Sequence, residues 1–100
     1  MTIYEMITTE LKLPCAYGYH STKQTPPYFC VMGSGQEQFQ ADNTYYTKKN
    51  SWQVEYYFTD KDTELEEAIE NLFLNNGYKY NKSEDVYIES EDVFVIYYDL

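Results

Sequence analysis

An amphipathic helix over residues 63–76 is the feature that most constrains how this chain folds. Its apolar residues recur at i, i+3, i+4, i+7 and i+8, the spacing of one helix face: Leu65, Ala68, Ile69, Leu72 and Phe73. Thr63 and Glu66 have the spacing of a capping box at its start, and Asn76-Gly77 predicts a left-handed stop at its end. A helix with one apolar stripe must cover a second apolar layer, so the flanking segments have to supply that layer.

Alternating side chains before this helix predict that the layer is an antiparallel sheet. Over residues 52–59, large apolar side chains take every second position: Trp52, Val54, Tyr56 and Phe58. Further strands are predicted at residues 28–32, 41–47, 78–81, 86–90 and 93–98, with turns at Gly33-Ser34-Gly35 and at residues 48–51. Residues 93–98 are apolar on both faces, which predicts a strand that is paired on both sides.

The first quarter of the chain predicts a short helix followed by an irregular connection. The helix has one apolar face, formed by Ile3, Met6, Ile7 and Leu11. Thr2 is its predicted cap and Pro14 its end, while residues 15–27 predict no regular element. Residues 1–100 are therefore expected to form a single α+β domain, an antiparallel sheet of about four to five strands with two helices packed on one face, in the order α-β-β-β-α-β-β.

Tyrosine content and net charge limit the classes of function that this protein can have. The 13 tyrosines suit strands, and they equally suit protein interfaces because each ring is apolar and each hydroxyl is polar. Seven basic and 17 acidic residues give a net charge of −10, which argues against direct affinity for nucleic acid or anionic membranes. No apolar run approaches the ~20 residues of a membrane span, and residues 1–14 lack the pattern of a signal peptide. A cytosolic protein is predicted.

No motif in the sequence assigns a catalytic, cofactor-binding or metal-binding residue. His20 with Cys15 and Cys30 supplies too few ligands for zinc, and a Cys/His nucleophile pair would need an activated thiolate. Both cysteines are predicted to be free thiols. An enzyme would need a pocket that gathers His20, Cys15 or the paired acids of residues 84–85 and 89–92. The sequence therefore predicts a protein that is not an enzyme and has no cofactor.

Other acidic and glycine-containing stretches also have simpler interpretations. Asp60, Asp62 and Glu64 resemble the start of a calcium loop, but Leu65 stands where glycine is needed and Asn71 where a bidentate glutamate is needed. The acids at the helix start complement its dipole, and Glu64, Glu67 and Asn71 occupy its solvated side. Gly33-Ser34-Gly35 lacks the remaining residues of a phosphate-binding loop and predicts a turn.

Several stretches between residues 26 and 100 together resemble the small neck proteins of long-tailed bacteriophages. They are Pro26-Pro27-Tyr28 before a strand, Ala41-Asp42-Asn43 before Tyr45-Tyr46, residues 52–59 followed by Lys61-Asp62-Thr63-Glu64-Leu65-Glu66, Asn76-Gly77-Tyr78, Tyr80-Asn81-Lys82, and Glu89-Ser90-Glu91 before residues 93–98. These stretches are most similar to tail terminator, or tail completion, proteins of siphophages that infect Gram-positive bacteria. The matching positions are core and turn residues, so no binding residue is transferred individually.

The resemblance implies a structural protein of the virion, assembled in the host cytoplasm. Its implied form is a homo-hexameric ring that caps the tail tube and joins it to the head, with the tail tube protein and the head connector protein as partners. Head-closure and adaptor proteins of the same neck are alternatives, as is an acidic host-takeover inhibitor that mimics nucleic-acid charge. The expected contact surfaces are residues 17–25, 33–40 and 82–92, because long loops in a small chain often carry function.

Overall fold

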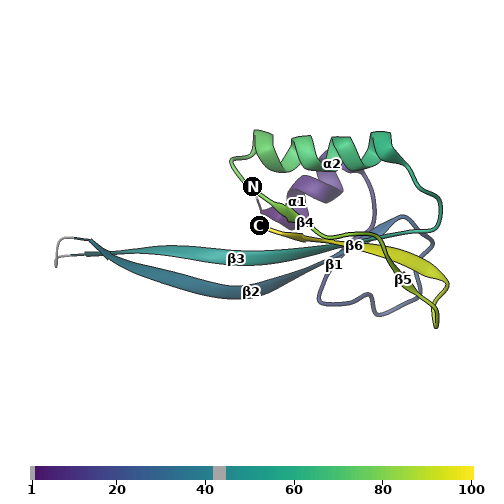
Figure 1. Ribbon diagram of the computed structural model, residues 1–100, viewed down its shortest axis with the longest axis horizontal. Coiled ribbons are helices and arrows are strands. Elements are labelled where there is room, and N and C mark those ends of the chain that lie inside the picture. Colours follow the sequence, from purple (N-terminus) through teal and green to yellow (C-terminus); the bar gives the residue numbers. More distant parts are fainter. Residues whose placement is uncertain (1, 42–44) are drawn as a thin grey trace.

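A computed structural model describes residues 2–41 and 45–100 of the chain. It is an α+β fold in which a six-stranded, mostly antiparallel sheet carries both helices on one face (Figure 1). The elements are α1 (Ile3–Met6), a π-helical turn η1 (Ile7–Leu11), β1 (Cys15–Tyr17), β2 (Tyr28–Ala41), β3 (Tyr45–Phe58), α2 (Thr63–Asn75), β4 (Asn81–Lys82), β5 (Val86–Ile88) and β6 (Val93–Asp99). The predicted fold class is confirmed, although the sheet has more strands than expected.

The N-terminal helical segment begins and packs as predicted. The Thr2 hydroxyl oxygen accepts a hydrogen bond from the Glu5 backbone N–H at 3.1 Å, which caps α1. The segment continues through η1 and ends where Lys12 adopts a left-handed conformation, φ 56°. Ile3, Met6 and Ile7 are buried, so this short segment covers one part of the core.

The β2–β3 hairpin is much longer than the sequence indicates. The turn predicted at Gly33-Ser34-Gly35 is wrong, because β2 runs through it with a register shift: Gly33 pairs with Trp52 and Gly35 with Ser51. Ser34 is the extra residue of a β-bulge, and Gly35 takes a φ of 131° that favours glycine. The turn predicted at residues 48–51 is also wrong, since these residues lie within β3. The strand predicted at residues 41–47 is divided between β2 and β3, with residues 42–44 outside the described part of the chain.

The strand order of the sheet is β1-β2-β3-β6-β4, and β5 also pairs with β6. Strand β6 is therefore paired on both sides, as predicted from its two apolar faces. Strand β1 lies within residues 15–27, where no regular element was expected, and it pairs in parallel with β2. Three residues are too few to produce a periodic pattern. The strand predicted at residues 78–81 is displaced to β4, whereas the extended segment at residues 86–90 contains β5.

Helix α2 is confirmed, but its cap and its inner face differ from the prediction. Asp62, not Thr63, is the cap: its Oδ1 accepts a hydrogen bond from the Leu65 backbone N–H at 3.0 Å. The capping box is wrong, because the carboxylate of Glu66 binds lysines instead. Ala68 is exposed and Glu66 is buried, so the apolar stripe is narrower than expected.

The C-terminal stop of α2 follows the predicted pattern. Gly77 has a φ of 85°, and the Tyr78 backbone N–H donates to the Phe73 carbonyl oxygen at 2.9 Å. Asn76 adds a side-chain hydrogen bond to the Leu72 carbonyl oxygen at 2.8 Å. The chain therefore leaves the helix in a direction that returns it to the sheet as β4.

A single cluster of buried side chains joins the helices to the sheet. Its members come from α1, η1, α2 and the helix-facing sides of the strands, and include Met6, Ile7, Phe29, Val31, Val54, Tyr56, Phe58, Ile69, Phe73, Ile96 and Tyr98. Aromatic rings of three adjacent strands stack across the sheet, with centroid separations of 5.1 to 5.6 Å along Phe29, Tyr56, Phe58 and Phe94. Within residues 2–41 and 45–100, no helix is long and apolar enough to cross a membrane.

Candidate functional site

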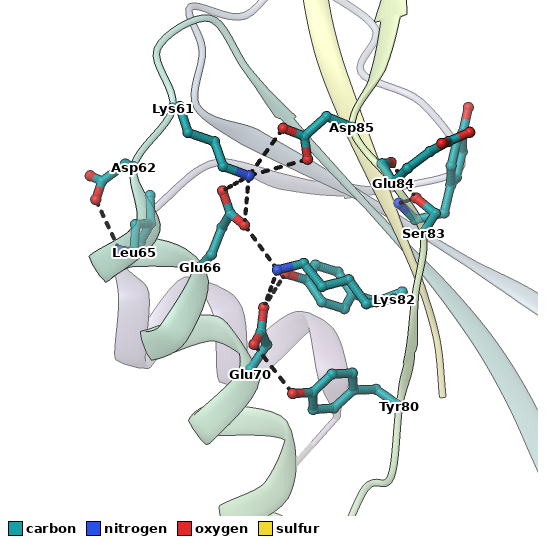
Figure 2. Close-up of polar contacts among 12 residues, drawn as sticks. Lys61, Asp62, Leu65, Glu66, Glu70, Tyr80, Lys82, Ser83, Glu84 and Asp85 are labelled. Carbon is teal, nitrogen blue, oxygen red and sulfur yellow. Dashed lines mark hydrogen bonds and ion pairs between the residues drawn. The ribbon is translucent and has the colours of Figure 1, made fainter.

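A network of ion pairs connects α2 to the segment that follows it (Figure 2). The Lys82 ammonium lies 2.9 Å from Oε1 of Glu66 and 2.8 Å from Oε2 of Glu70. The Lys61 ammonium lies 2.7 Å from Oε2 of Glu66, a charge contact without an aligned hydrogen bond to that atom, and 3.0 Å from Asp85. Glu66 is only 4% exposed, so its charge depends on these two lysines.

Two tyrosine hydroxyls complete the network at Glu70. Tyr98 donates to Oε2 at 2.9 Å and Tyr80 donates to Oε1 at 3.2 Å. Burial opposes ionisation of Glu70, but hydrogen bonds from Lys82 and Tyr98 outweigh burial and lower the pKa of the Glu70 carboxyl. Burial also opposes the charge of Lys82, yet its bonds to Glu70 and Glu66 raise its pKa to about 12. Glu70 and Lys82 are therefore both charged at neutral pH, and the network holds residues 80–85 against the helix.

An open groove lies on the opposite face of the sheet. Phe29 and Val31 point to the helices, so the alternate residues Tyr28 and Cys30 lie on the other face. The groove has a volume of about 810 Å³ and is lined by residues 18–24, Pro26, Tyr28, Cys30, Tyr57, Thr59 and residues 90–93. Parts of two of the three expected contact surfaces therefore meet at one place, residues 18–24 of the first and residues 90–92 of the second. Lys82 and Asp85 of the second lie instead in the ion-pair network. The third, residues 33–40, belongs to β2 and is not a loop.

Aromatic and polar contacts shape the floor of the groove. Tyr28 stacks on Tyr57 with ring centroids 4.8 Å apart, and His20 meets the edge of Tyr28 at 5.2 Å. The Tyr57 hydroxyl donates to Oε1 of Glu55 at 2.7 Å, and Glu55 is only 8% exposed. The floor is thus an aromatic surface with a buried carboxylate beside it.

The groove brings His20 and Cys30 together, but not in an arrangement that activates the thiol. Nε2 of His20 lies 2.9 Å from the Phe29 carbonyl oxygen, so that ring nitrogen is occupied by backbone. Burial and the nearby Glu55 raise the pKa of Cys30 to about 11, while burial and Cys30 raise that of Cys15 to about 12. Both thiols are free, as predicted, and both are buried. A protonated thiol is a poor nucleophile, so these groups give no support to thiol catalysis.

Metal coordination gains no support from the arrangement of side chains. Across the described residues, no three histidine, cysteine, aspartate or glutamate side chains are grouped so that they could hold a metal ion. Asp62, which stood in the rejected calcium pattern, caps α2, while Asp60 and Glu64 are exposed.

Alkaline conditions are expected to destabilise the fold from about pH 9 upward. Burial raises the pKa of Cys15 to about 12, of Cys30 to about 11 and of Tyr56 to about 12. The unfolded chain releases these protons first, so the stability present below pH 9.0 is lost as the pH rises toward 12. Urea midpoints measured at a series of pH values should fall over this range. A midpoint that stays constant from pH 9 to 11 would contradict the raised pKa values of these groups. Cys30→Ala should remove only the part of the fall that comes from Cys30 and leave the part from Cys15 and Tyr56.

The outer part of the β2–β3 hairpin forms a projecting ribbon, defined here as residues 36–41 and 45–50. Its two strands pair with each other from Gln36 and Asn50 to Ala41 and Tyr45, whereas β6 pairs with β3 only from Gln53 to Phe58. Figure 1 shows the ribbon extending away from the helices and the rest of the sheet. An isolated two-stranded hairpin is at best marginally stable in water, so this segment is suited to be covered by another molecule.

Sequence reasoning missed both the ion-pair network and the ribbon. The i, i+4 spacing of Glu66 and Glu70 was the available signal for the network, but it did not reveal that both carboxylates face the sheet.

No protein-family model matches the chain, and no curated protein has a significantly similar sequence.

Proposed function

We propose that the protein is a structural subunit of a phage head-tail joint, where copies form a ring that caps the tail tube and connects it to the head. The ribbon carries this proposal. It is a long hairpin whose outer residues have no pairing partner other than each other within the described chain. Such a segment costs stability in a lone subunit and becomes useful when a neighbour covers it. The proposed role is structural and involves no catalysis.

Two further features support this assignment. The α+β fold, with both helices on one sheet face, is the architecture that the resemblance of residues 26–100 implies. The ribbon and the groove also lie toward opposite ends of the long axis, with the ribbon at the left of Figure 1 and the β5–β6 turn at the right. A subunit with distinct contact surfaces at its two ends can be joined head to tail around a ring.

The distribution of acids gives less support to a mimic of nucleic-acid charge. Such a protein needs free carboxylates in a continuous track. Here Glu55 and Glu66 are buried, Glu70 and Asp85 are held by lysines, and Asp62 caps a helix. These five carboxylates are buried or bound by other groups of the same chain, so they are not free to form such a track.

Removing the ribbon is expected to abolish assembly without unfolding the body. Residues 36–50 are replaced by Asn-Gly, so that the paired residues Gly35 and Ser51 are joined by a short hairpin turn. Light scattering and native mass measurement should show rings for the full chain, free or on isolated tail tubes, and monomers for the truncated chain. Circular dichroism should show cooperative unfolding of both. A full chain that stays strictly monomeric and does not bind tail tubes would overturn the proposed function.

A further inference from the structure

Two buried glutamates lie on opposite sides of the sheet, and only one of them has a cation. Glu66, on the helix side, is held by two lysines at 2.7 and 2.9 Å. Glu55 is only 8% exposed and pairs in register with Cys30, which lines the groove. Its Oε1 accepts a hydrogen bond from the Tyr57 hydroxyl, and among the side chains that the structure describes no lysine pairs with it. Because a buried carboxylate without a cation is costly, the groove side of the sheet favours a cation from outside.

Negative charge extends across the floor of the groove. Glu91 lines the groove from an exposed turn, and Lys23 is the one lysine among the described residues that line it. Burial raises the pKa of Tyr28, and Glu91 and Glu55 raise it further. Burial, then Glu55 and Glu91, likewise raise the pKa of Cys30 to about 11. Among the described residues no lysine opposes either change, so Lys23 leaves the floor negative.

An exposed tyrosine also lines this groove. Tyr19 is 80% exposed, although the backbone that carries it is tied to the sheet. The Gly18 N–H donates to the Val31 carbonyl oxygen at 2.8 Å, and the Tyr19 N–H donates to the Tyr17 carbonyl oxygen at 3.0 Å. The ring is therefore held in place and open to another molecule. Arginine suits such a surface, because its planar guanidinium both stacks on aromatic rings and donates to carboxylates.

The chain itself contains no arginine. Its seven basic residues are all lysines: Lys12, Lys23, Lys48, Lys49, Lys61, Lys79 and Lys82. The groove, with a volume of about 810 Å³, is larger than one side chain requires and can take a segment of several residues. The net charge of −10 also attracts a basic partner. A segment of a different protein is therefore the occupant that matches the groove best.

We propose that the groove binds an arginine-bearing segment of a partner protein, whose guanidinium pairs with Glu91 and stacks on a tyrosine ring of the groove. This inference rests on the proposed function, in which each subunit contacts proteins other than its own copies. It assigns the groove to one of those proteins, so that in the ring the ribbon meets the next copy outside the groove.

Short peptides test this site on the full chain. The probe is acetyl-Gly-Arg-Gly-amide, titrated to millimolar concentrations at low salt and followed by amide NMR signals of the protein. Two matched peptides replace arginine with lysine or with citrulline, its neutral analogue of nearly the same shape. The arginine peptide should shift the signals of residues 18–24 and 90–93. The lysine peptide should bind more weakly, and the citrulline peptide should not bind.

Two variants should weaken binding of the arginine peptide. Glu91→Gln is expected to lower the affinity roughly three- to fivefold, the effect of losing an exposed ion pair. Glu91 is preferred to Asp92, because Asp92 already accepts a hydrogen bond from the Tyr87 hydroxyl at 2.6 Å. Tyr19→Ala is expected to have an effect of about the same size through the loss of stacking.

Matched controls make the same changes at exposed residues that do not line the groove. Glu89→Gln removes a charge two positions from Glu91, and Tyr17→Ala removes a tyrosine that is 54% exposed. Both controls should bind the arginine peptide like the natural chain. Equal losses for E91Q and E89Q, signals that shift over the whole acidic surface, or no shifts at all would overturn the site.

The remaining outcomes distinguish the occupant and the proposed function. A lysine or citrulline peptide that binds as tightly as the arginine peptide would overturn the choice of arginine. Self-association of the natural chain that E91Q abolishes and E89Q preserves would place a second copy in the groove and overturn the partner. Ring formation and tube binding are measured separately. A chain that binds the arginine peptide in the groove but forms no ring and binds no tail tube would overturn the proposed function and not the site.

Discussion

Replacing Lys82 with methionine is expected to lower the free energy of unfolding by about 3 kcal/mol. Lys82 lies within 3 Å of both Glu66 and Glu70, and its removal leaves two inward-facing carboxylates with only one other cation, Lys61. Breaking a buried pair from one side costs ~3–5 kcal/mol, and the partial exposure of Lys82 places this case at the lower end. Urea unfolding followed by circular dichroism measures the change, with a melting temperature lower by roughly 10 °C or more.

A matched variant shows whether the loss comes from the network. Lys79→Met makes the same change three residues earlier, at an exposed lysine, and should alter stability by less than ~0.5 kcal/mol. The triple variant E66M/E70M/K82M should recover most of the loss, because apolar residues of similar size often replace a buried ion pair without cost. If K82M and K79M are equally stable, the network does not hold residues 80–85 to the helix.

Phe73→Ala is expected to destabilise the protein by ~3–5 kcal/mol, the range for truncating a fully buried aromatic ring. The Phe73 side chain is completely buried and meets the Tyr98 ring edge-on at 5.4 Å and the Tyr80 ring at 6.3 Å. Its loss leaves a cavity between α2, β6 and the segment leading to β4. Since small domains have only ~5–15 kcal/mol of stability, thermal unfolding should show a large decrease in melting temperature.

The neighbouring residue provides the control for this prediction. Leu74 is 52% exposed, so Leu74→Ala removes an apolar side chain from the same helix turn without opening a cavity. Its effect should stay below ~1 kcal/mol. Similar losses for the two variants would show that the buried face of α2 has been assigned incorrectly. Because the two positions share one helix turn, differences in helix propensity cannot explain a large difference between the two losses of stability.

Elements with a periodic pattern that reaches the core were predictable from the sequence. Helix α2, the inner half of β3 and β6 all place apolar residues at regular intervals, since each buries one face or both. The outer hairpin has no such pattern. Gly33-Ser34-Gly35 and residues 48–51 have the composition of turns because a strand that leaves the core has no apolar face to bury. Polar composition alone does not distinguish a turn from a solvated strand.

The candidate surfaces were predictable only in part, for a similar reason. The sequence identified residues 17–25 and 82–92 as contact surfaces, but the meeting of residues 18–24 with residues 90–92 depends on the pairing of β1 with β2 and of β6 with β3. For Glu66, the capping role predicted from the sequence was wrong. An acid in the first turn of a helix commonly binds backbone N–H groups, and only the folded position of Lys82 shows that this one is buried against a cation.

The bulge at Ser34 lies where the hairpin leaves the sheet, and one inserted residue there bends and twists the strands beyond it. If neighbouring subunits are joined through the ribbon, the direction in which it leaves the body sets the angle between them. That angle decides how many copies complete a circle. The circumference of the ring, and with it the width of the channel that it encloses, would then depend on a single serine between two glycines.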